Sequence, residues 1–225
     1  MKKILLPIIL ITALALAAAA QAAPLSQEAI VNGISSRYQG INSISASYSR
    51  VASTPKTDKI FQNSSSQMAT GLLSWSRPAK LLLDQKSPQP ETMVTDGSTV
   101  WWYIPSESLA YRYRNMDVAG QLRPLLNFLS GLDSLRANFE ISLAKADPGR
   151  MGQHGLALKP KVRDGNVNGI TVWCDDGFNL TGFRLNAATG ETTDFYLTGF
   201  MENPKLNDSI FKFKPPKGVD LIDED

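Results

Sequence analysis

Residues 70–114 constrain the fold more than any other part of the sequence. Short β-prone runs alternate there with turn signals, of which Asp96-Gly97 is the clearest. An Asp-Gly pair between runs of apolar and β-branched residues is among the strongest short-range signals for a β-hairpin. The stretch therefore predicts an antiparallel meander of four or five strands, each of which presents one apolar face.

Helical periodicity interrupts the strands in two places. Residues 26–39 predict an amphipathic helix with Ser26 as its N-cap. Apolar residues between 117 and 135 recur at helical spacing and predict one or two short helices. Turn signals divide the rest into strands expected at 41–52, 138–145, 154–160, 169–174, 178–185 and 192–200, with a last short strand at Phe211 and Phe213. Roughly eleven strands and two helical segments predict an α+β domain, with helices on one face of a curved antiparallel sheet.

The first 23 residues predict a secretory signal peptide. A basic start precedes an apolar run, and residues 20–22 (AQA) form a small-x-small cleavage pattern. We expect cleavage near Ala22 or Ala23, which leaves one exported domain at 24–225. The alternative is a retained membrane anchor, because the apolar run is close to the shortest that spans a bilayer.

The charge balance disfavours two classes of partner. Removing the signal peptide also removes Lys2 and Lys3, which leaves 23 − 2 = 21 basic residues against 21 acidic ones. A neutral domain is poorly suited to binding nucleic acid or an anionic membrane surface.

Residues that enzymes depend on are scarce. His154 is the only histidine and Cys174 the only cysteine, too few for a zinc site or an internal disulfide. We interpret His154 as a turn residue and Cys174 as packing at a strand end. Asp175 and Asp176 precede Gly177 in a hairpin-turn pattern and are not read as a catalytic pair. We therefore expect no enzyme activity, metal or cofactor; a periplasmic hydrolase is the disfavoured alternative.

Aromatic residues are concentrated on the predicted meander. Trp101 and Trp102 are adjacent, so their side chains must point to opposite faces of one strand. If helices cover one face loosely, an apolar cavity remains between them, which is the usual form of a lipid site. A filled core with ordinary exposed aromatics is the alternative.

Two motifs resemble the outer-membrane lipoprotein carrier proteins, the LolA family. The first is an Arg-Pro pair after a short aromatic strand, followed by a P…V-x-DG-x-x-W-x-Y-x-P run, and the second is IFKFKPPKGV at residues 210–219. The matching residues of the first motif are Trp75, Arg77, Pro78, Pro90, Val94, Asp96, Gly97, Trp101, Tyr103 and Pro105. The similarity extends over most of the predicted domain and is weakest between residues 148 and 203.

The resemblance implies an incomplete antiparallel β-barrel with a helical lid over a hydrophobic cavity. It implies a periplasmic carrier that takes lipoprotein acyl chains from an inner-membrane ABC-type release complex and delivers them to an outer-membrane lipoprotein receptor. We expect a monomer. Tyr48 and Arg50 depart from the Phe and Gln that relatives tend to have, and residues 79–83 are aliphatic where an aromatic is frequent. A carrier of another lipid or glycolipid, and an envelope module that senses lipoproteins, remain alternatives.

The resemblance also implies residue roles. Arg77 corresponds to an arginine that bonds to the lid and holds the free protein closed; the alternative is a solvated charge. The lid is expected to comprise segments 26–39 and 117–135, with Ile30, Ile34, Leu122, Leu125, Leu126 and Leu129 as its apolar residues. The residues expected to line the cavity are Ile44, Tyr48, Trp75, Leu81, Leu83, Val94, Trp101 and Tyr103.

Overall fold

The computed structural model describes residues 25–53, 68–114, 122–132, 135–162 and 167–224. The predicted signal peptide and its cleavage site lie outside these residues. Within them, no helix is both long and apolar enough to cross a membrane.

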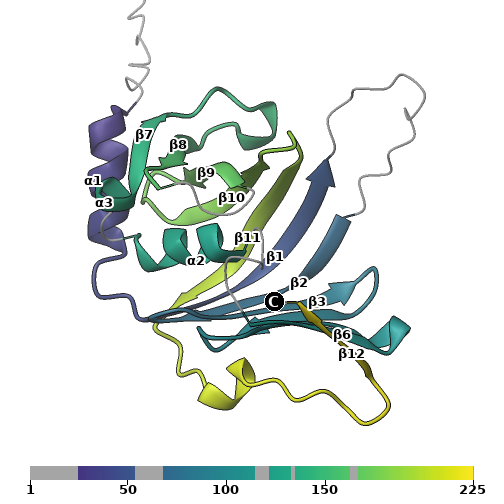
Figure 1. Cartoon of the computed structure of the whole chain (residues 1–225). Helices are drawn as coiled ribbons and strands as arrows, with labels where there is room; N and C mark the ends of the chain where they lie inside the picture. Colours follow the sequence, from purple (N-terminus) through teal and green to yellow (C-terminus); the bar gives the residue numbers. More distant parts are fainter. Residues whose placement is uncertain (1–24, 54–67, 115–121, 133–134, 163–166, 225) are drawn as a thin grey trace, which may run out of the picture.

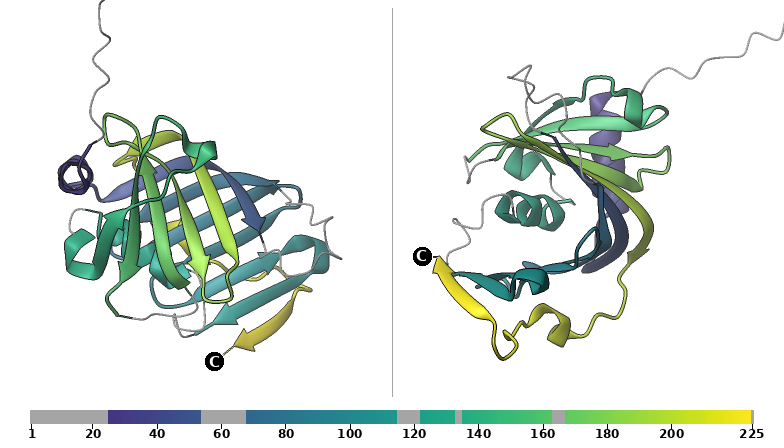
Figure 2. Two further views of the ribbon diagram at one scale, coloured as in Figure 1. Left: turned by 90° about the horizontal axis from the view of Figure 1, so that it is seen from above. Right: turned by 90° about the vertical axis from the view of Figure 1, so that its right-hand side faces the viewer.

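The described residues form one twelve-stranded sheet, in the order β12-β6-β5-β4-β3-β2-β1-β11-β10-β9-β8-β7. The strands are β1 (Ser43–Ser53), β2 (Met68–Ser76), β3 (Lys80–Ser87), β4 (Glu91–Thr95), β5 (Val100–Ile104), β6 (Leu109–Tyr113), β7 (Phe139–Leu143), β8 (His154–Pro160), β9 (Val167–Cys174), β10 (Leu180–Ala187), β11 (Thr192–Glu202) and β12 (Asp220–Glu224). Its edges, β12 and β7, do not pair, so the strongly curved sheet stays open (Figures 1 and 2). This arrangement agrees with the predicted incomplete barrel.

The predicted meander is confirmed over β2 to β6. At the Asp96-Gly97 turn, Oδ1 of Asp96 accepts hydrogen bonds from the backbone N–H groups of Ser98 (2.9 Å) and Thr99 (3.2 Å). Gly97 has a φ of +99°, which other residues rarely adopt. The turn pairs Thr95 with Val100 and thereby sets the register of β4 against β5.

The prediction of a last strand at Phe211 and Phe213 is wrong. Asp208–Phe211 forms a 3-10 helix, η3, and Phe213 packs its ring against the outer face of the sheet. The last strand is instead β12, whose sequence DLIDE is too acidic to read as a strand. It pairs in parallel with β6, where Asp223 forms ion pairs with Arg112 and Arg114.

Three α-helices accompany the sheet in the part of the chain that the structure describes. In α1 (Gln27–Arg37), Ser26 Oγ accepts a hydrogen bond from the N–H of Ala29 at 3.2 Å, which confirms the predicted N-cap. The apolar stretch after residue 117 forms α2 (Leu122–Ser130) and α3 (Leu135–Asn138). Figures 1 and 2 show α2 inside the hollow of the sheet and α1 across one end of it, beside β7 and β8.

A glycine in α1 is explained by close packing. Gly33 is poor for helix stability, yet a Cβ at this position would lie 2.4 Å from ring carbons of Phe178. Phe178 follows the Asp175–Gly177 turn between β9 and β10 and has a φ of +61°. The ring therefore occupies the space that any larger residue at position 33 needs.

We expect Gly33→Ala to lower the free energy of unfolding, measured in urea. Overpacking typically costs about 1–3 kcal/mol, which exceeds the helix propensity gain of about 1 kcal/mol. Ser36→Ala, at an exposed position of the same helix, is the matched control and should be neutral or slightly stabilising. A Gly33→Ala variant as stable as Ser36→Ala would show that Phe178 does not limit this position.

Candidate functional site

Strand register divides the side chains of the meander between two faces. Residues paired across neighbouring antiparallel strands lie on the same face. Ile44 pairs with Trp75, and Trp75 with Leu81. All three are buried in the core cluster that also contains the apolar residues of α2. The face they share is therefore the concave face, against which α2 packs.

Five of the eight predicted lining residues lie on this concave face. They are Ile44, Tyr48, Trp75, Leu81 and Leu83, of which only Leu83 keeps appreciable exposure. Burial raises the pKa of Tyr48 to about 12, so its hydroxyl stays protonated at neutral pH.

Val94, Trp101 and Tyr103 lie on the opposite, convex face, which corrects their assignment to the lining. Val94 pairs with Leu82 and Trp101, and none of these faces α2. The rings of Trp101 and Tyr103 instead pack on Phe213, with centroids 5.5 and 5.3 Å apart. Alternation alone could not decide the inward side of β5, because its sequence VWWYI is apolar on both faces.

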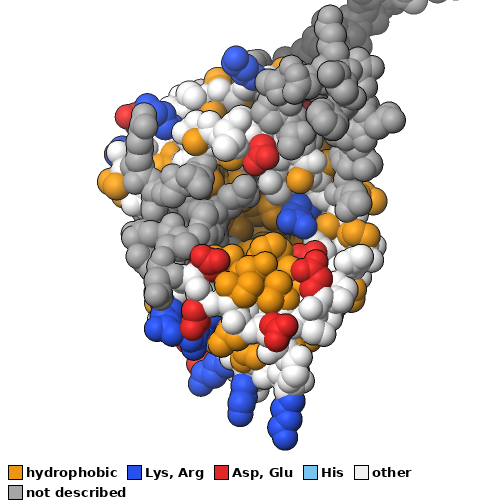
Figure 3. Space-filling model, turned by 45° about the vertical axis from the view of Figure 1, so that its right-hand side comes forward, with side chains coloured by type: hydrophobic (Ala, Val, Ile, Leu, Met, Phe, Trp, Pro, Cys, Tyr) orange, Lys and Arg blue, Asp and Glu red, His pale blue; other side chains and the backbone are white. Residues whose placement is uncertain are grey.

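The inward residues of these strands were not predicted. Trp102 pairs with Met93 and Tyr111, and Tyr111 pairs with Ile222 of β12. The Trp102 and Tyr111 rings stack with centroids 5.3 Å apart, and Tyr113 continues the row at 6.4 Å. We call this surface the concave wall; it consists of Leu83, Met93, Trp102, Tyr111, Tyr113 and Ile222. Figure 3 shows a hollow on this side of the molecule with a hydrophobic floor and charged side chains around it.

Helix α2 lies in the hollow and buries part of its surface (Figures 1 and 2). Its residues Leu125, Leu126, Phe128 and Leu129 are buried, and the ring of Phe128 lies 6.1 Å from that of Phe183 on β10. The predicted lid residue Leu122 belongs to α2, but its side chain lies outside what the structure describes. A depression of about 40 Å³ remains beside Tyr48 and the concave wall. One water molecule needs about 10–15 Å³ of such space, so this depression has room for a few water molecules and not for a long alkyl chain.

A larger depression lies elsewhere. It measures about 450 Å³ and lies over β7 to β10, where exposed polar residues such as Glu140, Ser142 and Lys159 border it. Ile141, Ala157 and Leu158 also line this depression, so its lining is mixed. It lies apart from the concave wall, and we do not assign it to lipid binding.

Arg77, the predicted latch residue, forms hydrogen bonds with the end of α2 and with the chain before β1. Its Nε donates to the carbonyl of Ile41 and its guanidinium nitrogen to the carbonyl of Ser130, both at 2.9 Å. Ser130, the last residue of α2, donates from Oγ to the carbonyl of Pro78 at 2.7 Å. Arg77 therefore connects the chain before β1 to the C-terminal end of α2, where a cation is also favoured by the helix dipole.

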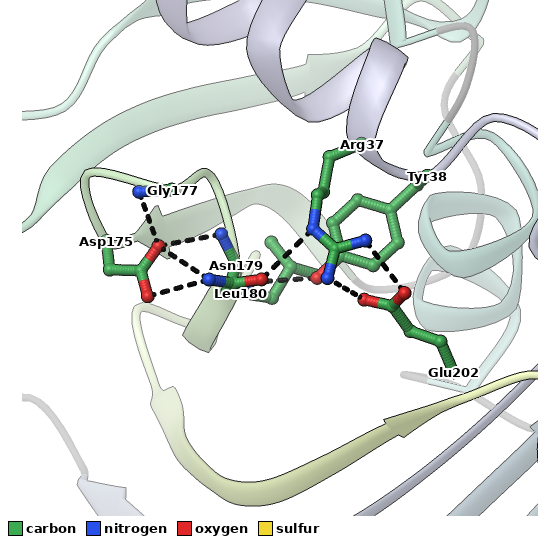
Figure 4. A network of polar contacts seen from close by, with 7 residues as sticks. All are labelled: Arg37, Tyr38, Asp175, Gly177, Asn179, Leu180 and Glu202. Carbon is green, nitrogen blue, oxygen red and sulfur yellow. Dashed lines mark hydrogen bonds and ion pairs between the residues drawn. The ribbon is translucent and has the colours of Figure 1, made fainter.

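A separate network holds α1, and Figure 4 shows it. The Arg37 guanidinium binds both carboxylate oxygens of Glu202, at 2.7 and 2.5 Å, and donates to Asn179 Oδ1 at 3.1 Å. The Tyr38 hydroxyl accepts from the N–H of Leu180 at 2.9 Å, and burial raises its pKa to about 12. Asp175 in turn fixes Asn179 through backbone and side-chain bonds.

The two helices of the predicted lid, α1 and α2, are thus held in place by different contacts. Ile30 and Ile34 of α1 are buried. The helix end is tied to β11 by the bidentate ion pair of Arg37 with Glu202, and to the β9–β10 turn by the hydrogen bond of Arg37 to Asn179. The end of α2 is tied by Arg77 and Ser130 to the loops at the start of β1 and β3.

Among the described residues, neither His154 nor Cys174 is grouped with the partners that a catalytic site requires. His154 Nε2 lies 2.9 Å from Asp176 Oδ1 near the surface. Burial raises the pKa of Cys174 to about 12, so the thiol is not a nucleophile at neutral pH. In the part of the chain that the structure describes, no three His, Cys, Asp or Glu residues are grouped to hold a metal ion.

Comparison with known proteins identifies the family of this chain. Residues 39–214 match the family model described as outer membrane lipoprotein carrier protein LolA. The outer-membrane lipoprotein carrier protein of Pasteurella multocida is 28% identical over 188 residues, covering 84% of this chain and 84% of that protein. That of Cupriavidus necator is 31% identical over 154 residues, covering 68% and 70%. A solved LolA superfamily protein from Nitrosomonas europaea has a TM-score of 0.43 at 12% identity, over 84% of this chain and 98% of that one. Because the family model spans most of the sequence, the chain belongs to the LolA family of outer-membrane lipoprotein carrier proteins.

Proposed function

We propose that this protein carries lipoproteins by enclosing their acyl chains against the concave face of its sheet. Membership of the LolA family supports lipoprotein cargo. The observation that carries the proposal is that the concave face is apolar and is covered by one short helix, α2, whose buried residues an acyl chain can replace. Binding of this kind needs no covalent chemistry.

The free energy gained by burying the apolar side chains of α2 is comparable to the free energy gained by burying an acyl chain. Burying four large apolar side chains of α2 contributes about 1.5–3 kcal/mol each, or roughly 6–12 kcal/mol in total. An acyl chain contributes about 0.8 kcal/mol per buried CH₂. On the order of ten methylenes therefore offset the loss of α2 from the wall.

Arg77 and Arg37 suggest which helix moves. The contacts that hold the end of α2 include the hydrogen bonds that Arg77 and Ser130 donate to backbone carbonyls, and water can replace these bonds. The Arg37–Glu202 pair is bidentate and is reinforced by the buried Tyr38. We infer that α2 is the moving lid, that Arg77 is its latch, and that α1 remains in place as a fixed end of the cavity.

The route of the cargo follows from the family resemblance. We propose that the protein is exported, with its signal peptide cut near Ala22 or Ala23, and acts in the periplasm as a monomer of one domain. It would receive cargo from an inner-membrane ABC-type release complex and deliver it to an outer-membrane receptor. Since the acyl chains are held by apolar burial, release requires an acceptor with a comparable apolar site.

The decisive test is binding of a triacylated lipopeptide to the exported form, residues 24–225, followed by native mass spectrometry. We expect a one-to-one complex that is lost when the acyl chains are removed. Trp102→Glu should weaken it at least about tenfold, because a charge placed against an acyl chain must be desolvated.

Leu72→Glu is the matched control for Trp102→Glu. Leu72 is 45% exposed and lies on the convex face, opposite Ser47 and Asp84. Its substitution should leave lipopeptide affinity unchanged. Equal lipopeptide affinities of the two variants would show that the concave wall does not contact the acyl chains. If glycolipid co-purified with the protein and no lipopeptide bound, the cargo would be glycolipid and not lipoprotein.

Arg77→Leu should loosen α2 without unfolding the sheet. Each hydrogen bond to a charged group contributes about 1.5–3 kcal/mol, so amide hydrogen exchange in residues 125–130 should accelerate at least about tenfold. Amides of β1 and β11 should keep their protection. Lys80→Leu, which removes a convex-face cation bound to Asp208, is the control. Unchanged exchange in α2 would show that Arg77 is not its latch.

A further inference from the structure

A row of polar residues borders one end of the concave wall. Gln85 of β3 pairs with Glu91 of β4, immediately beyond the apolar pair Leu83 and Met93. Arg50 of β1 lies one step further along the same face, since it follows Tyr48 by two residues. All three polar residues border the depression of about 40 Å³ that α2 leaves open.

The contacts within this row are specific. Arg50 donates to Oε1 of Gln85 at 2.7 Å, and Nε2 of Gln85 donates to the carbonyl of Gln89 at 2.9 Å. The indole N–H of Trp102 donates to Glu91 at 3.1 Å. Gln85 is only 5% exposed, so the polar row is built into the sheet and is not a solvated surface.

Space for the row is created by a glycine. A Cβ at Gly71 would lie 2.7 Å from the Tyr48 hydroxyl and 2.8 Å from the Cα of Gln85. The missing side chain lets the Tyr48 ring lie across β2 toward Gln85. This arrangement places an aromatic ring and a buried amide directly beside a guanidinium.

We propose that Arg50, supported by Gln85, binds ester carbonyl oxygens where the acyl chains of the cargo join its polypeptide. This inference rests on the proposed carrier function and names a subsite within it. A guanidinium has five N–H donors and no acceptor. Among the described residues, Arg50 uses one donor on a side chain, the bond to Gln85. Ester carbonyls at the root of acyl chains are acceptors only, so the two groups are complementary.

Charge and length support this placement. Arg50 and Glu91 border the same depression with opposite charges, so the row is neutral and does not favour an anionic head group. From Arg50 to Ile44, β1 advances six residues, or roughly 20 Å at ~3.3 Å per residue. Chains anchored at Arg50 would therefore run along the concave face of β1, toward the end of α2 that Arg77 holds.

The test compares two lipopeptides with identical chains, one joined by ester bonds and one by ether bonds. For Arg50→Met, we expect affinity for the diester lipopeptide to fall about tenfold or more, the loss of a hydrogen bond to a charged group. Affinity for the diether should change little, since it has no carbonyl at that position. Arg50→Gln, a second variant that keeps a polar side chain, should retain part of the ester preference. Lys159→Met, an exposed cation paired with Glu140 on the far part of the sheet, controls for loss of charge.

Several outcomes would overturn the proposal. If Arg50→Met lost the same affinity for the diester and the diether lipopeptide at an unchanged melting temperature, Arg50 would not bind the ester carbonyls. A loss confined to a fatty acid or a phospholipid would make the row an anion site. If the unmodified protein bound no acylated ligand at all, the carrier function itself would fall, and the subsite with it.

Discussion

The packing of α2 against the concave face is the interaction on which the rest of the structure depends. A strongly curved sheet presents a large apolar surface, and in aqueous solution other apolar groups must cover such a surface. Four buried side chains of α2 provide the cover, and Arg77 fixes the end of the helix. In the carrier function proposed above, an apolar ligand of similar contact area replaces this short helix, whereas the sheet itself need not change.

The two faces of the meander are covered in different ways. On the convex face, Phe213 packs on Trp101 and Tyr103, and η3 lies against β3. That cover belongs to the continuous C-terminal chain, which is fixed further along by the pairing of β12 with β6. On the concave face, the contacts of Arg77 and Ser130 hold α2 in place. In the proposed carrier function, the cover of the convex face stays in place and only the cover of the concave face is exchanged for cargo.

The sequence predicted the strands and helices well because their signals are local. The Asp96-Gly97 turn and the Ser26 N-cap depend on neighbours within three residues, and both form as predicted. The inward side of β5 was predicted wrongly, because Trp101 and Trp102 are equally apolar and the choice depends on Phe213, more than a hundred residues later. The strand β12 was missed for the same reason: its acidic residues are stabilised by Arg112 and Arg114 of β6, which no local pattern reveals. Arg77 could be placed only through the family resemblance.

The pairing of β1 with β11 has a consequence for how the protein is made. These strands join the two halves of the sheet, yet Tyr48 and its partner Leu197 are separated by most of the chain. Contacts of such long range slow folding, because the intervening loop must close before any pairing stabilises it. A nascent chain can form the β2–β6 meander early, but the edge of β1 that pairs with β11 stays unpaired until residues 192–202 have been synthesised. During that interval the unpaired edge of β1 can pair with another chain, so the partly synthesised protein is prone to aggregation.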